Sequence, residues 1–191
     1  MAASEVAICN DALIMCGAER ITSLSNSDSA SRLCNEQYAR ARDQLLISHP
    51  WNFAMKRVQL SSLSELPSGW TDNNEYTYAF TIPADCLRVW DIDDQDEDWD
   101  VESGYVFANY TPIQLKYVEK VTNTGRFSAA FDNVLALDLA IKIGYSLTQS
   151  AAFIQQLRLM REDAIRAARS FDAQEASSKE ILATDFLASR L

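Results

Sequence analysis

Apolar residues recur with a helical period at the start of the chain. They stand three or four residues apart, which places them on one face of a helix. Ser4 is suited to cap the first turn, and Gly17 is suited to end the last one. The pattern therefore predicts a helix from about Ser4 to Cys16. The apolar positions on its face are Val6, Cys9, Leu13 and Cys16.

A second helical pattern begins near Ser27 and runs to about Ile47. Its apolar positions follow a period of 3.6 residues, and its charged residues fall on the other side. Pro50 disfavours the helical conformation at His49, so the helix must end there. We expect Pro50, Trp51 and Phe53 to pack at the junction between this helix and a following strand.

Between about residues 53 and 119 the pattern changes to that of β-strands. Aromatic and β-branched residues gather in short segments, which are separated by polar or Pro- and Gly-containing stretches. We expect a small antiparallel sheet, with the acidic stretch Asp91–Glu102 as part of a hairpin. The expected strands are Phe53–Leu60, Tyr76–Ile82, Cys86–Ile92, Tyr105–Ala108 and Ile113–Val118.

Helical periodicity returns in the last third of the chain. The segment Ser128–Leu147 is apolar nearly all round, which predicts a central core helix. Ser150 is a suitable cap for an amphipathic helix that runs to about Phe171 or beyond. Residues 172–191 show weak periodicity, and we expect a partner to order them.

These patterns together predict an α+β fold with three parts. Residues 1–52 and 120–171 are expected to form a mainly α-helical four-helix bundle. Residues 53–119 are expected to form a small antiparallel β domain inserted between the two helical halves. Residues 172–191 are expected to form an extended C-terminal tail.

The charge of the chain is unevenly distributed. The net charge is −10, yet the segment from Val89 to Leu115 has no Lys or Arg and carries −8, which leaves −2 for the remainder. Nucleic-acid binding relies on Lys and Arg that neutralise phosphates. The chain is therefore not expected to bind nucleic acid specifically. A membrane span is not expected either, because no apolar run approaches the roughly 20 residues that one requires.

The residues that usually carry catalysis or bind metal do not occur in recognisable patterns. His49 is the only histidine, and its place before Pro50 at a helix end favours capping or packing. The four cysteines lack the close-spaced pairs of zinc sites, so we expect buried thiols in a reducing compartment. No phosphate-binding Gly-rich loop and no nucleophile elbow are present. We therefore predict no catalytic residue, no metal and no cofactor.

The acidic stretch Asp91–Glu102 matches a calcium loop only loosely. With Asp91 at position 1, Asp93 and Gln95 loosely fit positions 3 and 5 and Glu102 falls at position 12, but Asp96 stands at position 6, where such a loop needs Gly. A solvated hairpin is the simpler interpretation. A negative surface facing DNA that must slide without sticking is the functional one, since like charge repels phosphate. The residues assigned to that surface are Asp93, Asp94, Asp96, Glu97 and Asp98.

The four tryptophans divide into two pairs. Trp51 and Trp90 lie in apolar patterns and are expected in the core. Trp70 and Trp99 lie in polar segments, which makes them candidates for interface anchors.

Five groups of segments stand in an informative order along the chain. They are Ile8–Gly17 with Arg20–Leu24, Tyr38–Leu46 continuing into His49–Ala54, Tyr78–Pro83 with Asp85–Val89, Ile113–Val118 and Leu135–Leu147. Taken in order, they resemble the portal–tail adaptors of tailed phages, a family that includes tail tubular protein A and related head-completion proteins. The similarity covers about residues 5–169, and its specificity comes from the order and spacing of the motifs. The unbroken acidic loop Asp91–Asp100 departs from the family, where a Gly-rich turn is usual.

This resemblance implies a structural protein of the virion neck or tail, made in the host cytoplasm. It implies a homo-oligomer in the form of a dodecameric ring, which binds the portal protein, presents a platform to the tail nozzle protein and lets double-stranded DNA pass. Trp70 and Trp99 become candidates for subunit or nozzle contact. The expected portal-contact residues are Phe171, Ile181, Leu182, Phe186, Leu187 and Leu191.

Two other functions remain open from the sequence. One is a small helical protein-interaction module that forms no ring. The other is a virion enzyme that cleaves cell-wall glycan, which would need a carboxylic acid of raised pKa and a second carboxylate across a cleft. No isolated pair of acids in the sequence stands out for that role.

Overall fold

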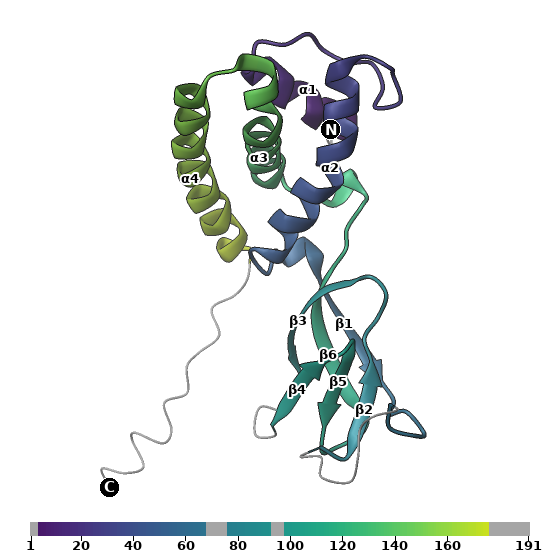
Figure 1. Cartoon of the computed structure of the whole chain (residues 1–191). Helices are drawn as coiled ribbons and strands as arrows, with labels where there is room; N and C mark the ends of the chain where they lie inside the picture. Colours follow the sequence, from purple (N-terminus) through teal and green to yellow (C-terminus); the bar gives the residue numbers. More distant parts are fainter. Residues whose placement is uncertain (1–3, 68–75, 93–97, 176–191) are drawn as a thin grey trace, which may run out of the picture.

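The structure, a computed structural model, describes residues 4–67, 76–92 and 98–175. Within these residues, four α-helices form one part of the molecule and two small antiparallel sheets form another (Figure 1). The α+β fold class is therefore confirmed. The helices are α1 (Glu5–Met15), α2 (Ser29–Ile47), α3 (Ala129–Thr148) and α4 (Ala151–Gln174). The strands are β1 (Met55–Leu60), β2 (Tyr78–Thr81), β3 (Cys86–Ile92), β4 (Trp99–Glu102), β5 (Tyr105–Ala108) and β6 (Ile113–Glu119).

Short polar side chains begin all four helices. Ser4 caps α1, Ser128 caps α3 and Ser150 caps α4, each accepting a hydrogen bond from a backbone N–H of the first turn. The second helix begins two residues later than the sequence pattern indicated. Asp28 is its cap, because the carboxylate accepts hydrogen bonds from both the N–H and the hydroxyl of Ser31, at 2.8 Å each.

The helix α3 is central to the helical part, as its apolar sequence predicts. It contacts α1, α2 and α4, and the most extensive contact is with α4. Phe131, Val134, Leu135 and Leu139 are fully buried in this core. Gly144 lets α4 approach closely, since a Cβ at that position would lie 2.8 Å from the Ile154 side chain.

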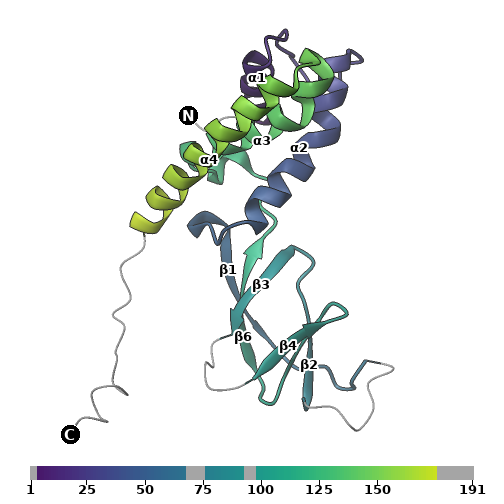
Figure 2. The same cartoon turned by 60° about the vertical axis from the view of Figure 1, so that its left-hand side comes forward.

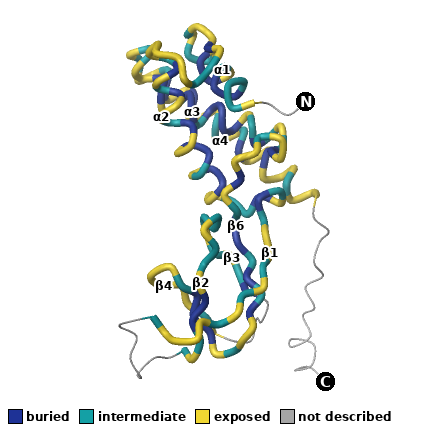
Figure 3. The backbone as a smooth tube through the Cα atoms, turned by 90° about the vertical axis from the view of Figure 1, so that its right-hand side faces the viewer, coloured by how far each residue is buried: buried dark blue, intermediate teal, exposed yellow. Residues whose placement is uncertain are grey.

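The β part contains two three-stranded sheets instead of the single sheet expected. One sheet has the order β1-β6-β3 and the other β2-β5-β4, with all pairs antiparallel. Its own apolar cluster includes Phe80, Ile92, Val106 and Tyr117. Figure 3 shows buried positions both in the helices and in these strands.

The strand β4 was not predicted, because its residues were assigned to the acidic stretch. Trp99–Glu102 pairs with β5 through a turn at Ser103 and Gly104. Trp99 packs against the apolar cluster, while Asp100, Val101 and Glu102 are exposed. An acidic segment can form an edge strand when one side chain packs inward and the others face solvent.

The chain crosses between the two parts twice, and ion pairs brace the crossings. One crossing is η1 (Asn52–Ala54) and the other includes η2 (Thr124–Arg126). Arg126 binds Glu119 at 2.8 Å and donates to the Phe53 carbonyl at 2.6 Å, so it joins both crossings. Figure 2 shows α2 leading directly toward the β part.

Candidate functional site

The aromatic residues after Pro50 form a packed cluster at the junction of the two parts. Trp51 is fully buried, and its indole N–H donates to the Leu45 carbonyl at 3.0 Å. The rings of Trp51 and Phe53 lie 5.2 Å and 5.0 Å from the Phe131 ring, both edge-on. The cluster therefore links the end of α2 to the beginning of α3. Its geometry suits packing, because edge-to-face rings stabilise cores.

A polar clamp holds the end of α4 against the same junction. The Asp172 carboxylate accepts from the Asn52 N–H at 2.9 Å and lies 3.2 Å from His49 Nε2. Arg169 donates to the Ser48 carbonyl at 3.2 Å. The helix thus continues to Gln174, beyond the boundary at residue 171 that the sequence indicated. His49 is part of this clamp, although its partner Asp172 is remote in the sequence.

Much of the predicted contact surface falls outside the described residues. Phe171 is described, and its side chain is 60% exposed on α4. Asp98 is described and exposed just before β4. The predicted residues that lie outside the described ranges are Trp70, Asp93, Asp94, Asp96, Glu97, Ile181, Leu182, Phe186, Leu187 and Leu191.

The structure corrects the predicted burial of Trp90 and shows what surrounds Trp99. Trp90 was expected in the core, but it is 37% exposed, and the Arg88 guanidinium lies 5.0 Å from its ring. Trp90 lies on the edge strand β3, where the sheet has no further strand to cover it. Trp99, expected as an interface anchor, is partly buried against the apolar cluster of the β part.

The cysteines are free thiols in apolar surroundings. Cys9 and Cys34 are fully buried, and Cys16 and Cys86 are half-buried. A hydrogen bond with the Cys34 thiol, together with burial, raises the pKa of Cys9 well above its usual value. Burial raises the pKa of Cys86 to about 11. Cys9 and Cys86 are therefore protonated at neutral pH, and thiols in that form are poor nucleophiles, whereas the hydrogen bond with Cys9 lowers the pKa of Cys34.

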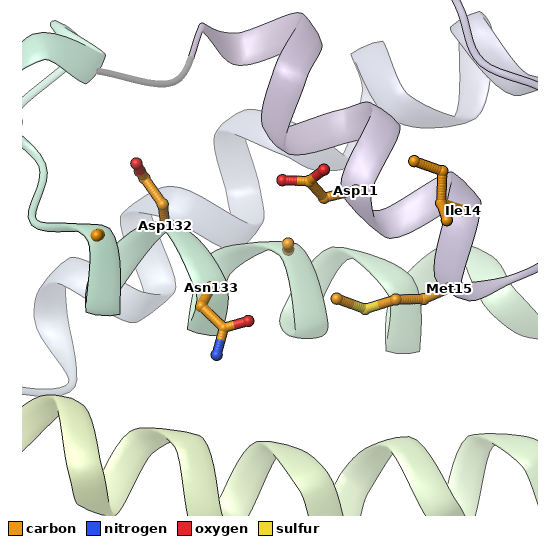
Figure 4. Close-up of a pocket in the computed structure, with 7 residues that line it drawn as sticks. Asp11, Ile14, Met15, Asp132 and Asn133 are labelled. Atoms are coloured by element: carbon orange, nitrogen blue, oxygen red, sulfur yellow. The ribbon is translucent and has the colours of Figure 1, made fainter. Parts of the chain in front are cut away.

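A groove opens between α1 and the first half of α3 (Figure 4). It has a volume of about 470 Å³. Ile14, Met15 and the alanines of α3 make most of it apolar. Asp11 extends from α1 toward the side of the groove where Asp132 rises from α3. The lining residues are Asp11, Ile14, Met15, Ala129, Asp132, Asn133 and Ala136.

Asp132 is the electrostatically unusual residue of this groove. Burial, and secondly the nearby Asp11 carboxylate, raise the pKa of Asp132 to about 6. Its Oδ1 atom is buried and receives no hydrogen bond from any described residue. An ionised carboxylate in such a place is costly unless a donor or a cation is supplied.

Sequence reasoning missed this groove. A signal was present, because Asp132 is a charged residue within a helix that is otherwise apolar nearly all round. The pattern does not show what lies opposite, since Asp11 is remote in sequence and is brought close only by the packing of α1 on α3.

Other kinds of site are absent from the part of the chain that the structure describes. There, no three His, Cys, Asp or Glu side chains come together in a way that could hold a metal ion. Among the same residues, none of the helices combines the length and apolar character needed to cross a bilayer.

The chain was also compared with known proteins. It matches no protein-family model, and a search of curated proteins returns no match.

Proposed function

We propose that this protein is a structural adaptor in the virion of a tailed phage with a short tail. Copies of it form a ring, as a dodecamer in the adaptors that the sequence resembles, which joins the portal to the tail nozzle and lines the DNA exit channel. In this proposal the four helices serve as the bundle of such adaptors. The β part, with Trp70 and Trp99, meets the nozzle or a neighbouring subunit, and the C-terminal segment meets the portal.

The observation that supports this proposal best is that the chain forms two separately packed parts. A helical part and a β part each have their own apolar cluster, and a braced junction joins them. The clamp on Asp172 fixes the end of α4 at that junction. A protein that bridges two different partners needs surfaces held in a fixed relation.

The first experiment measures the mass of the purified protein, alone and mixed with a cognate portal ring, by light scattering, followed by electron microscopy. An adaptor is expected to add a ring of density to the lower face of the portal. A protein that ignores the portal and stays monomeric would contradict the proposal and favour a small helical interaction module.

Removing the C-terminal segment tests the portal contact directly. Deletion of residues 176–191 leaves α4 and its clamp complete. We expect portal docking to be lost while the thermal unfolding midpoint stays close to that of the full chain, because α4 and its clamp remain complete. A full-length Leu159→Ala variant, changed at an exposed position of α4, serves as the control. Retained docking by the shortened chain would refute the assigned role.

One observation bears on the glycan-cleaving alternative. Asp132, with its raised pKa, and Asp11 across the groove are the kind of pair that such an enzyme uses. Apart from these acids, however, Asn133 is the only polar side chain lining the described groove, and sugars require many hydrogen-bonding groups. Hydrolysis of purified peptidoglycan that is lost in Asp132→Asn would favour the enzyme over the adaptor.

A further inference from the structure

Among the residues that the structure describes, no Lys or Arg lines the groove between α1 and α3, which contains two carboxylates. Asp11 is exposed, and Asp132 is partly buried with an Oδ1 atom that receives no hydrogen bond from the described residues. Beside them, the Ile14 side chain is 45% exposed and Met15 is half-buried. An apolar wall with two adjacent acids favours a partner that brings a cation on an apolar stem, as arginine does.

The outer face of α2 carries such side chains. Arg32, Glu36 and Arg40 are four residues apart, so they form one exposed stripe along the helix. Neither the Arg32 nor the Arg40 guanidinium makes a hydrogen bond or ion pair with the residues that the structure describes. Ile47 continues the same stripe and is 38% exposed. This surface therefore offers arginines and an apolar end that match the acids and the Ile14 edge of the groove.

Part of the groove lies on the side of α3 that faces away from α2, while Asp132 lies near Tyr38 of α2. Lys142 donates to Gln44 of α2 at 2.8 Å, which marks the side of α3 that faces α2. Asn133, which lines the groove, is nine residues earlier, or about two and a half helical turns at roughly 100° per residue. It therefore faces away from α2. Two different, complementary surfaces on one molecule allow identical subunits to join head to tail and, if the rotation closes, to form a ring.

We infer that copies of this chain bind one another head to tail, with the Arg32–Arg40 stripe of α2 in one copy entering the Asp11–Asp132 groove of the next. This inference rests on the proposed function, because it names the subunit interface of the ring. The guanidinium places a positive charge beside the exposed Asp11 carboxylate and near Asp132, whose Oδ1 atom receives no hydrogen bond from the described residues. The contact is heterologous, so each subunit uses one surface for each neighbour.

Two charge reversals test this interface. Asp11→Arg places two cations opposite each other, and Arg40→Glu places two anions opposite each other; both positions are exposed, so the fold tolerates them. We expect the wild-type mass to rise with concentration in sedimentation velocity experiments. Each single variant should self-associate about tenfold more weakly or worse, since like charges across an interface repel. Arg158→Glu makes the same charge change at an exposed site on α4 and should behave as wild type.

An equimolar mixture of Asp11→Arg and Arg40→Glu provides the sharpest readout. Every contact between unlike variants pairs opposite charges, so the mixture should regain assembly with the two variants alternating. The single variants exclude an isologous dimer, because a contact through one surface alone would be altered only by the variant that changes that surface. A wild-type chain that stays monomeric at every concentration, variants that self-associate as wild type does, or a mixture that fails to assemble would each overturn the interface.

The same proteins separate this inference from the proposed function. Assembly of the wild type without any binding to a portal ring would refute the adaptor while leaving the interface standing. Portal binding by single, unassociated copies would overturn the interface and leave the adaptor standing.

Discussion

At the scale of single residues, this protein shows how similar side chains acquire different roles from their surroundings. Trp51 and Trp90 both occur in apolar stretches, yet one is fully buried and the other is 37% exposed. Trp51 lies between two helices that close over it, whereas Trp90 lies on the edge strand of a sheet. Both tryptophans lie in apolar segments of the sequence, so only the tertiary packing explains why one is buried and the other is partly exposed.

Trp51 should therefore contribute far more to stability than Trp90. Trp51→Ala removes a buried indole, its contact with Phe131 and its hydrogen bond to Leu45, so we expect a loss of about 3–5 kcal/mol in the free energy of unfolding. Trp90→Ala removes the same side chain from a partly exposed site and should cost about 1 kcal/mol or less. Urea unfolding of the two variants provides the comparison, and equal losses would contradict this account.

Asp132 should make stability depend on pH. Its pKa of about 6 in the folded protein exceeds the ordinary value of 3.8, because of burial and of Asp11 on α1; the Tyr38 side chain of α2 also faces it. The folded state therefore takes up the proton first as the pH falls from 6 toward 4. The ionised carboxylate destabilises the fold fully above pH 6, and this cost disappears below about pH 4.

Replacing Asp132 by asparagine tests the predicted direction of this pH dependence. Asp132→Asn should stabilise the isolated chain at pH 8, by of the order of 1 kcal/mol after allowance for solvent screening. The advantage should shrink as the pH is lowered through 6. Thermal unfolding midpoints at several pH values measure it, with Asp163→Asn on the surface of α4 as control. An advantage independent of pH would contradict the assignment.

At the scale of elements, most helices and strands were predictable, while the exceptions have identifiable causes. The bounds of β3 and β5 agree with the sequence pattern, and three of the four helices begin at the expected serine caps. The strand β4 was not predicted because its acidic residues were assigned to the acidic stretch, although Trp99 packs against the apolar cluster. The expected boundary between α4 and the C-terminal tail, after residue 171, lies before the true end of the helix at Gln174, because the last turn is held by His49 and Asn52, which are remote in sequence.

The clamp at the end of α4 should hold that last turn in place. Asp172→Ala removes the acceptor of both the His49 ring and the Asn52 N–H, so we expect a loss of about 1–2 kcal/mol. Amide hydrogen exchange should become faster near residues 168–174. Asp163→Ala removes an exposed ion pair on the same helix and should leave exchange there unchanged. Unaltered exchange in Asp172→Ala would exclude the clamp as a stabilising feature.

At the scale of the whole molecule, the uneven charge has a consequence for the proposed channel. Neutralising the acidic loop by Asp93→Asn, Asp94→Asn and Asp96→Asn removes repulsion between this loop and DNA, if the loop lines the channel. We then expect slower or incomplete DNA ejection from assembled particles, measured by the fraction of genome released. Neutralising Glu162 and Asp163 on α4 is the matched control. Unchanged ejection would indicate that the acidic loop is a solvated hairpin.

The sequence by itself determined the α+β class, the order of the elements and the absence of recognisable catalytic motifs. These properties follow from local causes: the helical period of apolar residues, short polar caps and the break at Pro50. The tertiary structure alone decided which distant residues meet. It split the strands into two sheets, joined His49 to Asp172, exposed Trp90 and brought Asp11 beside Asp132. Such pairings depend on how whole elements pack, and periodicity within a segment contains no information about its neighbours in space.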